Sequence, residues 1–197
     1  MTVSLRERRR QQTAREIQLA TLELAVRHGL ENVTTEEIAA SAGVSTRTFF
    51  NYYANKETAA VGAPPAFREE DKDALRDGTG ALADDIKRFL DQHFEILVRD
   101  EPILRMLGSV MQSNEKARGI LEGFLIMERG ELTECLCKRV HNRQSAGALA
   151  SAITDAIGRA IYLWNHEPDL SLGAALDIIW EGVIEASGLL AAPSSRS

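Results

Sequence analysis

Hydrophobic residues recur at helical spacing along most of the chain. Over residues 12–29, apolar positions share one helical face, and Gly29 stands where a helix-ending glycine is expected. No segment shows the strict alternation of apolar and polar residues that a half-buried strand would show. The pattern therefore predicts an all-α protein of about nine helices.

Three short helices are predicted after the first one. Thr34 can cap a helix, Glu37 completes a capping box three residues later, and Gly43 ends that helix after about two turns. Ser45 is the next capping residue, and a fourth helix over residues 56–61 is cut short by the glycine and prolines that follow. The second and third helices, joined by a glycine-containing turn, have the arrangement of a helix-turn-helix.

Five longer periodic segments follow and predict a helical body. They span residues 80–99, 101–112, 115–140, 145–167 and 171–190. Residues 62–79 are rich in proline, glycine and acidic residues, so they predict a connection with one short helix near residues 69–75.

Charge is unevenly distributed along the chain. Residues 1–60 hold eight Lys and Arg against seven Asp and Glu, residues 61–197 hold fifteen against twenty-two, and the sum is -6. In the first fifteen residues one glutamate, Glu7, stands among the arginines Arg6, Arg8, Arg9, Arg10 and Arg15. A basic segment thus precedes an acidic body, and its simplest interpretation is a flexible, solvated arm over residues 1–11.

The remaining composition argues against several classes of protein. Cys135 and Cys137 are two positions apart in a predicted helix and so point to different faces, and the four histidines show no zinc-type spacing. We therefore expect neither a metal nor another cofactor, and the absence of a phosphate loop or nucleophile elbow predicts no catalytic site. No apolar run approaches the about 20 residues that span a bilayer, and no secretory h-region follows the first arginines, so we expect a cytoplasmic protein.

Projection of the third helix at about 100° per residue separates its aromatic residues. Phe49 and Tyr53 fall on an inward stripe. Arg47 and Asn51 fall roughly opposite, where Arg47 can bond a guanine edge and Asn51 an adenine edge in the major groove of DNA. The alternative is that these are simply exposed polar residues of a small amphipathic helix.

The segment TTEEIAASAGVSTRTFFNYYANKE, residues 34–57, resembles the signature of the TetR/AcrR family of transcriptional regulators. The segment before it, IQLATLELAVRHGLENVT, is similar to that family's first helix, and the strong match covers about residues 12–60. By position, the resemblance implies DNA contacts from Thr35, Thr46, Arg47, Thr48, Phe50, Asn51, Tyr52 and Lys56.

Two positions depart from the family pattern. Phe50 stands where the family most often has a phosphate-contacting tyrosine, so it can offer only an apolar contact such as one to a thymine methyl. Glu36 replaces a polar or basic residue, and its carboxylate can accept a hydrogen bond from cytosine or repel a phosphate. We include Glu36 in the predicted DNA-binding set.

We predict a homodimer on a palindromic operator, an arrangement that the resemblance also implies. The predicted interface lies on the last two helices, where alanines recur every four residues beside bulky apolar residues. It consists of Ala152, Ala156, Ile157, Ala160, Ile161, Trp164, Ile179, Trp180 and Val183. The alternative is that these residues form the body's own core.

In this family the middle helices enclose an effector site, so the resemblance implies a site for a small molecule of unknown identity. The residues considered for its lining are His93, Phe94, Leu97, Met106, Met111, Phe124, Met127, Tyr162 and Asn165. For each of them core packing is the stronger interpretation, because any helical core requires apolar residues at this spacing.

The predicted organisation is a helix-turn-helix domain over residues 12–61, a connection over 62–79, a dimerisation and effector-binding domain over 80–190, and a disordered tail over 191–197. The predicted function is a sequence-specific DNA-binding regulator, acting as a ligand-responsive, homodimeric repressor. The alternative is an all-α small-molecule carrier or enzyme that uses a body cavity, with the head serving protein interaction.

Overall fold

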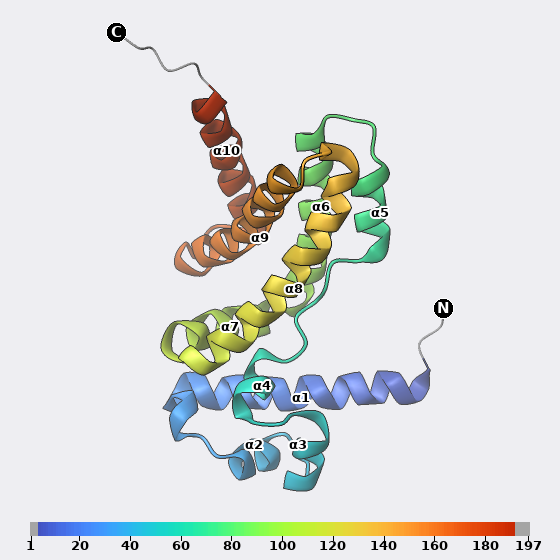
Figure 1. Cartoon of the computed structure of the whole chain (residues 1–197). Helices are drawn as coiled ribbons and strands as arrows, with labels where there is room; N and C mark the ends of the chain where they lie inside the picture. Colours follow the sequence, from blue (N-terminus) through green and yellow to red (C-terminus); the bar gives the residue numbers. More distant parts are fainter. Residues whose placement is uncertain (1–3, 192–197) are drawn as a thin grey trace. The chain divides into compact units, whose positions relative to one another are not determined.

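The structure, a computed structural model, describes residues 4–191, which form helices joined by turns and loops (Figure 1). In chain order the elements are α1 (Leu5–His28), η1 (Leu30–Asn32), α2 (Thr35–Ser41), α3 (Thr46–Tyr52), α4 (Lys56–Val61), α5 (Glu69–Asp77), α6 (Leu82–Leu97), η2 (Val98–Asp100), α7 (Glu101–Ser113), α8 (Glu115–Val140), α9 (Arg143–His166) and α10 (Leu172–Ala191). No strand occurs within residues 4–191, so the predicted all-α class is confirmed.

The chain forms two compact units, and their division cuts across the predicted domains. The head unit contains Met1–Pro65 and Asp100–Phe124, whereas the body unit contains Ala66–Arg99 and Leu125–Ser197. Helix α7 and the first residues of α8 therefore belong with the helix-turn-helix, although the sequence pattern assigned them to the body.

Capping groups define the helix ends around the turn between α2 and α3. The Thr34 hydroxyl accepts a hydrogen bond from the Glu37 backbone N–H at 3.2 Å, and the Glu37 carboxylate accepts one from the Thr34 backbone N–H at 2.8 Å. The Ser45 hydroxyl accepts from the Thr48 backbone N–H at 3.0 Å. Between these caps Gly43 has a φ of 66°, a conformation that favours glycine. The predicted capping box and turn are confirmed.

A hydrophobic cluster holds the helix-turn-helix on α1. Its buried members are Ile17, Val33, Ile38, Ala39, Phe49 and Ala59. Helix α3 ends at Tyr52, so Tyr53 is extended, with a φ of -135°, and does not continue the helical projection. Tyr53 nevertheless faces inward, because its hydroxyl donates to the Ala14 backbone oxygen at 3.1 Å.

A second cluster joins α1 and α4 to α7 within the head unit. Its buried members are Leu22, Ala25, Leu30, Ala60, Val61, Ile103, Val110 and Ala117. Polar contacts reinforce it: Arg15 donates to the Asp100 carboxylate at 2.9 Å, and the buried Glu57 pairs with Lys116 at 3.2 Å. The short helix α4 thus packs against α1 and α7 and is paired with the start of α8.

The basic segment at the start of the chain is helical from Leu5 onward. The Ser4 hydroxyl caps this helix by accepting from the Glu7 backbone N–H at 3.1 Å, and α1 continues unbroken to His28. The predicted flexible arm is therefore wrong for residues 5–11, while residues 1–3 lie outside the described part of the chain. Arginine, glutamate and glutamine are good helix formers, and adding turns to an existing helix is easier than nucleating one.

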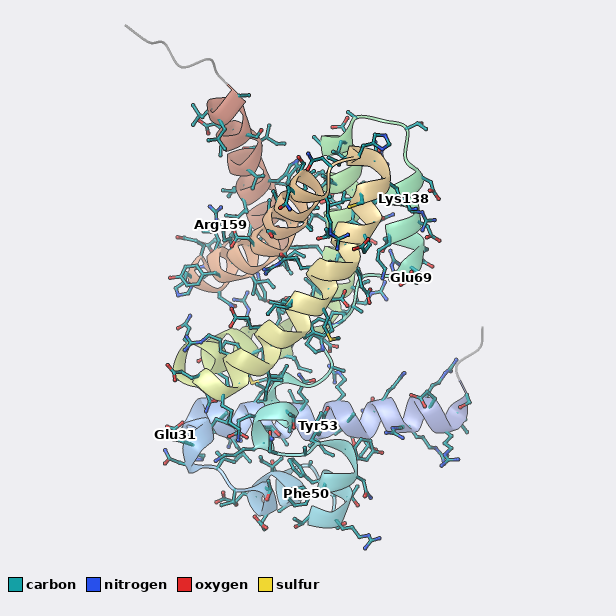
Figure 2. All side chains as sticks on the ribbon, viewed as in Figure 1. Glu31, Phe50, Tyr53, Glu69, Lys138 and Arg159 are labelled. Carbon is teal, nitrogen blue, oxygen red and sulfur yellow. The ribbon has the colours of Figure 1, made fainter. Side chains whose placement is uncertain are left out.

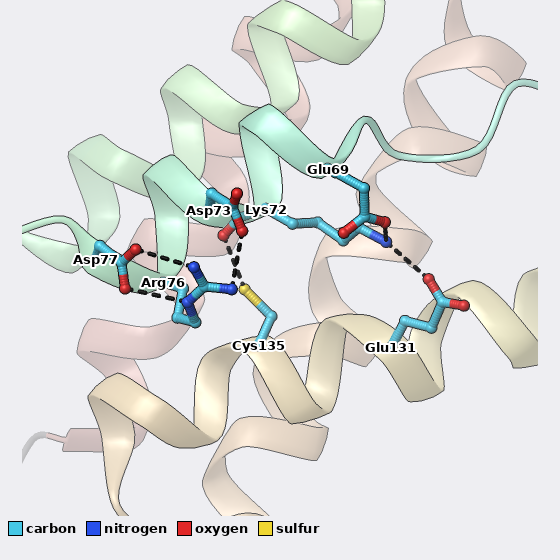
Figure 3. Close-up of polar contacts among 7 residues, drawn as sticks. All are labelled: Glu69, Lys72, Asp73, Arg76, Asp77, Glu131 and Cys135. Carbon is cyan, nitrogen blue, oxygen red and sulfur yellow. Dashed lines mark hydrogen bonds and ion pairs between the residues drawn. The ribbon is translucent and has the colours of Figure 1, made fainter.

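The predicted connection over residues 62–79 is divided between the units: residues 62–65 belong to the head unit and residues 66–79 to the body unit. Helix α5 covers Glu69–Asp77, and Lys72 on it pairs with Glu69 at 2.5 Å and with Glu131 of α8 at 2.7 Å (Figure 3). Burial lowers the pKa of Lys72, but hydrogen bonds to the two carboxylates outweigh burial and raise it to about 12. The Cys135 thiol donates to the Lys72 backbone oxygen at 3.1 Å, so this cysteine also fastens α5 to α8.

Helices α9 and α10 pack against each other, and α6 contacts both of them. Trp164, Leu176 and Ile179 are buried there. No helix in residues 4–191 is both long enough and apolar enough to cross a membrane. Residues 192–197, most of the predicted tail, lie outside the described residues, and Ala191 is the last residue of α10.

Candidate nucleic-acid interface

Helix α3 presents a largely polar face to solvent. Arg47 and Asn51 are exposed, and Phe50 keeps 52% of its surface exposed, whereas Phe49 is completely buried. Figure 2 shows Tyr53 beside α1 and Phe50 farther from it. The structure therefore contains the separation of inward and outward aromatic residues that the helical projection predicts.

Three predicted contact residues flank this face and are half-buried: Thr46, Thr48 and Tyr52. The Thr48 hydroxyl lies 2.8 Å from the Ser45 hydroxyl. The Tyr52 ring packs against the hydrophobic cluster that contains Phe49, and the Arg10 guanidinium lies 5.8 Å from the centroid of the ring. Tyr52 therefore borders both the outward face of α3 and the N-terminal turns of α1.

The first turn of α2 is acidic. The half-buried Thr35 hydroxyl donates to the Glu36 carboxylate at 3.1 Å. Hydrogen bonds from the backbone and side chain of Thr34 lower the pKa of Glu37, which keeps this second carboxylate ionised. Two negative charges at this helix start stabilise the helix dipole, and they also weaken its attraction for a phosphate.

The Lys56 ammonium group is engaged within the head unit. It donates to the Glu31 backbone oxygen at 2.8 Å and to the Val33 backbone oxygen at 2.9 Å. An ammonium group has three N–H donors, so one remains for the predicted phosphate contact. The structure thus gives Lys56 a structural role that the sequence did not indicate.

A groove of about 650 Å³ lies between the N-terminal turns of α1 and helix α3. We call it the arginine groove, and it is lined by Arg6, Glu7, Arg9, Arg10, Thr13, Thr48, Asn51 and Tyr52. The sequence analysis missed this site because it placed the arginines in a flexible arm. Their spacing of three and four positions, which puts them on one helical face, is the signal that could have found it.

The residues considered for an effector site belong to both units. They are divided between the head unit, with Met106, Met111 and Phe124, and the body unit, with His93, Phe94, Leu97, Met127, Tyr162 and Asn165. Met106 and Met111 pack against the hydrophobic cluster of the head unit, and Phe94 and Leu97 are buried in α6. Core packing therefore accounts for these four residues, and Met127 is exposed.

His93 is buried beside the Phe67 ring, with 4.7 Å between the ring centroids. Its Nδ1 atom has no hydrogen-bond partner among the described residues. Burial lowers the pKa of His93 to about 4, so the imidazole is neutral at neutral pH. A neutral, enclosed ring behaves as part of the core.

A second groove, of about 500 Å³, lies in the body unit between α8, α9 and α10. We call it the body groove, and it is lined by Leu125, Arg129, Thr154, Asp155, Gly158, Arg159, Tyr162, Leu163 and Ile179. Arg129 donates to the Thr154 hydroxyl at 3.1 Å, and Arg159 lies 3.9 Å from the Asp155 carboxylate. Tyr162, one of the residues considered for an effector site, lines this groove, whereas Arg129 and Arg159 were not among those residues.

Most of the residues predicted for the dimer interface are buried within the chain itself. They are Ala156, Ile157, Ala160, Trp164 and Ile179, whereas Ala152, Ile161, Trp180 and Val183 are half-buried. Small residues allow helices to approach closely, and here α9 packs against α10 and α6 of its own unit. These five residues belong to the core of their own unit, and a dimer interface over the nine residues stays a prediction.

A family model described as bacterial regulatory proteins of the tetR family matches residues 17–58. The match begins at the first buried residue of α1 and includes the whole of α2, the turn and α3. Residues 17–58 of the chain therefore match the tetR family.

A relative from Mycobacterium tuberculosis, named as a candidate mycofactocin biosynthesis transcriptional regulator, is 40% identical to this chain over 55 residues. The alignment covers 28% of each protein. The chain thus spans little more than a quarter of the length of this relative.

One solved tetR-family structure supports the same fold. The chain is similar to Thermus thermophilus FadR, a transcriptional repressor in complex with lauroyl-CoA, with a TM-score of 0.53 and 19% identity over 93% of this chain and 98% of FadR. A candidate regulator from Mesorhizobium loti has a TM-score of 0.49 and 17% identity over 89% of this chain and 96% of that protein. At 19% identity, the likeness to FadR is a likeness of fold.

The arginine groove extends beyond the part of the chain that matches the tetR family. Thr48, Asn51 and Tyr52 lie inside the matched segment, whereas the residues that α1 contributes precede residue 17. One wall of the groove thus lies within the matched segment, and the other precedes it.

Proposed function

We propose that this tetR-family protein is a sequence-specific, DNA-binding transcriptional regulator whose α3 enters the major groove. The observation that carries the proposal is the pair Arg47 and Asn51, exposed one helical turn apart while Phe49 anchors the opposite side. Arginine pairs well with guanine and asparagine with adenine, and each pairing contributes about 1–3 kcal/mol of discrimination.

The residues around this pair have supporting roles in the proposal. The exposed Phe50 ring offers an apolar contact to a thymine methyl, and Thr46, Thr48 and Tyr52 border the groove where phosphates lie. At the first turn of α2, the Thr35 hydroxyl donates a hydrogen bond to a phosphate. The Glu36 carboxylate either repels a phosphate or accepts a hydrogen bond from cytosine. Lys56 adds at most one further N–H to a phosphate.

Binding to DNA from upstream of the protein's own gene tests this assignment. We expect Arg47→Ala and Asn51→Ala each to weaken specific binding by roughly 5-fold to 150-fold, which corresponds to about 1–3 kcal/mol. Arg27→Ala is the control, because Arg27 is exposed in the last turn of α1 and away from the proposed interface. If both α3 variants bind as the unchanged protein does, α3 is not the recognition helix.

We further propose that the protein acts as a homodimer, because helix-turn-helix proteins usually need two half-sites for tight binding. The support is a group of exposed apolar side chains on α9 and α10: Tyr162, Ile178, Ile184, Leu189 and Leu190. Leu189 and Leu190 are 73% and 89% exposed, which is costly for leucines in a monomer. Sedimentation of the unchanged protein as a monomer at micromolar concentration would contradict the proposal.

The proposed mechanism of regulation is relief of repression by an amphipathic, anionic ligand in the body groove. Leu125, Leu163 and Ile179 provide apolar wall, and Arg129 and Arg159 provide donors for an anionic group. The ligand would favour a dimer whose recognition helices are wrongly spaced for successive major grooves. The complex of the similarly folded FadR with lauroyl-CoA makes that molecule a reasonable first probe.

Titration of the protein–DNA complex with lauroyl-CoA tests the ligand. We expect it to release DNA and to raise the thermal unfolding temperature of the protein without DNA. Leu163→Glu, which introduces a charge on the apolar wall, should suppress both effects. If lauroyl-CoA changes neither quantity, this ligand class is wrong, and the DNA-binding assignment is unaffected.

A further inference from the structure

We propose that the arginine groove holds a phosphodiester strand of the same DNA duplex that α3 reads. Helix α1 then forms a second DNA-binding wall, in addition to positioning the helix-turn-helix. The inference rests on the proposed DNA-binding function and extends it to residues that precede the tetR-family match.

The two walls of the groove come from different helices of the head unit. Arg6, Arg9 and Arg10 share one face of α1: Arg6 lies about 60° from Arg9 and about 40° from Arg10 on its other side, so the three span about 100°. Asn51 belongs both to the opposite wall and to the exposed face of α3. The groove therefore opens directly beside the surface proposed to read bases.

The charge in the groove suits a phosphate. Three arginines and Glu7 give the lining a formal charge of +3 - 1 = +2. Within residues 4–191, Arg6 and Arg9 form no ion pair with a carboxylate, whereas Arg15, farther along the same helix, is paired with Asp100. An unpaired guanidinium can donate two hydrogen bonds to phosphate oxygens at no cost of breaking an internal ion pair.

Arg10 links the two walls. Its guanidinium lies 5.8 Å from the centroid of the Tyr52 ring, a cation–π contact between α1 and α3. The Tyr52 ring is in turn packed against the hydrophobic cluster that contains Phe49. The width of the groove is therefore largely set before DNA arrives, which reduces the entropic cost of ordering these side chains on binding.

The N-terminal turns of α1 contribute little to the core of the head unit. Residues 5–12 are all exposed, and Ile17 is the first buried residue of the helix. Figure 1 shows α1 running on past α3 toward its N-terminal end. These turns thus carry charge on an exposed helical extension beside the recognition helix, which is a suitable position for contacting DNA flanking the bases that α3 reads.

Adjacent arginines provide a matched test. Arg9 lines the groove, whereas Arg8 is exposed about 100° round the helix and does not line it. Arg9→Gln and Arg8→Gln remove the same charge at neighbouring positions. Because each substitution occurs in both subunits of the proposed homodimer, we expect the slope of log Kd against log salt to fall by about 1.8 in Arg9→Gln, by about 3.6 in the Arg6→Gln/Arg9→Gln double variant, and by close to zero in Arg8→Gln.

Two further readouts identify a phosphate contact. The losses should be equal on operator and unrelated duplexes, because phosphate contacts carry no sequence information. Glu7→Gln should strengthen binding to both duplexes, because it removes the one negative charge in the groove lining. Far-ultraviolet circular dichroism should show unchanged helix content in every variant, which separates lost contacts from lost structure.

Different failures of this experiment have different meanings. If Arg9→Gln and Arg8→Gln change the salt slope equally, the groove holds no DNA strand, while the role of α3 stands as long as Arg47→Ala weakens specific binding. If the loss in Arg9→Gln is confined to one sequence, the arginines read bases and the phosphate assignment is wrong. If the unchanged protein binds no DNA sequence preferentially, the proposed function fails and this inference fails with it.

Discussion

The arginine groove of the head unit and the body groove of the body unit both contain arginines, but the arginines differ in their interaction partners. Arg6 and Arg9 in the first have no carboxylate partner within residues 4–191, whereas Arg129 in the second donates to Thr154 and Arg159 faces Asp155. The body groove also has leucine and isoleucine walls. The first groove therefore suits a polyanion, and the second suits a molecule that is mostly apolar. The partners of the arginines and the polarity of the groove walls, rather than the number of arginines, therefore indicate which kind of ligand each groove suits.

The supports beneath the two grooves differ as well. One wall of the arginine groove is the seven-residue helix α3, which depends on the small cluster around Phe49. The body groove is built on the much longer helices α8, α9 and α10. We therefore expect the head site to depend on a few residues and the body groove to be less sensitive to single changes.

The largest expected effect is on stability, and it comes from removing the buried side chain that packs α3 against the head unit. Phe49→Ala should lower the free energy of unfolding by about 3–5 kcal/mol, because it leaves a cavity in a small core. Phe50→Ala is the matched control, because the neighbouring ring is half exposed and its removal should cost within about 0.5 kcal/mol. Denaturant unfolding measures both. Equal losses would show that the head core does not depend on Phe49.

The next effect concerns the body unit and depends on pH. The pKa of His93 is about 4 in the folded chain, below its ordinary value of 6.5, with burial as the main cause, opposed by Asp71 and assisted by Arg68. Between these two values the unfolded chain binds a proton that the folded chain does not. The contribution of His93 to the free energy of unfolding is therefore fully present above about pH 6.5. Roughly 2–3 kcal/mol of it is lost as the pH falls toward 4.

His93→Leu should remove this pH dependence. The comparison is the difference in unfolding free energy between pH 7 and pH 4.5, with His166→Leu as the control because His166 is exposed. The His93 variant should lose most of the difference and the control should keep it. If His93→Leu keeps the full difference, another buried group causes the acid sensitivity.

A smaller effect separates folding from DNA binding at the start of α2. Thr34→Ala should cost about 1 kcal/mol of stability, because it removes the capping hydroxyl. Thr35→Ala should leave stability nearly unchanged and weaken DNA binding, because the hydroxyl of Thr35 bonds only the exposed Glu36 in this structure. Thermal unfolding and DNA titration of both variants measure the difference, and a reversed pattern would contradict the assigned roles.

The smallest expected effect on stability is in the body groove. Arg159→Gln should change the unfolding free energy by less than about 0.5 kcal/mol, because the ion pair with Asp155 is exposed and long. It should nevertheless weaken the binding of an anionic amphiphile such as lauroyl-CoA, measured by calorimetry. Arg143→Gln, on an exposed arginine outside the groove, is the control. Equal affinity in both variants would remove Arg159 from the proposed site.

Much of the head could be predicted because its determinants are local. The Thr34 and Glu37 capping box and the Ser45 cap join residues three positions apart, so both partners can be recognised in one short segment. The separation of Phe49 from Arg47 and Asn51 follows from the helical period alone. Lys56 could not be interpreted in this way, because its acceptors on Glu31 and Val33 lie more than twenty positions away.

The packing of the body was predicted less well, because its pattern of small and apolar residues is compatible with more than one arrangement of helices. The alanine stripe over Ala156 and Ala160 suits any close helix contact, and the sequence does not say whether the partner helix belongs to the same chain. In the structure it does, since both alanines are fully buried by their own unit. Apolar spacing likewise could not show that Met106 packs in the head unit while Tyr162 lines the body groove.

By itself, the sequence determined the helical fold class, the caps and turn of the helix-turn-helix, and the outward face of α3, because each depends on propensity or on contacts within one or two helical turns. Only the tertiary structure decided that α7 belongs with the head, that Ala156 and Ala160 of α9 are internal, and that the N-terminal arginines face Tyr52 and Asn51 across a groove. These features depend on which distant segments meet, and helical periodicity specifies a face without specifying its partner.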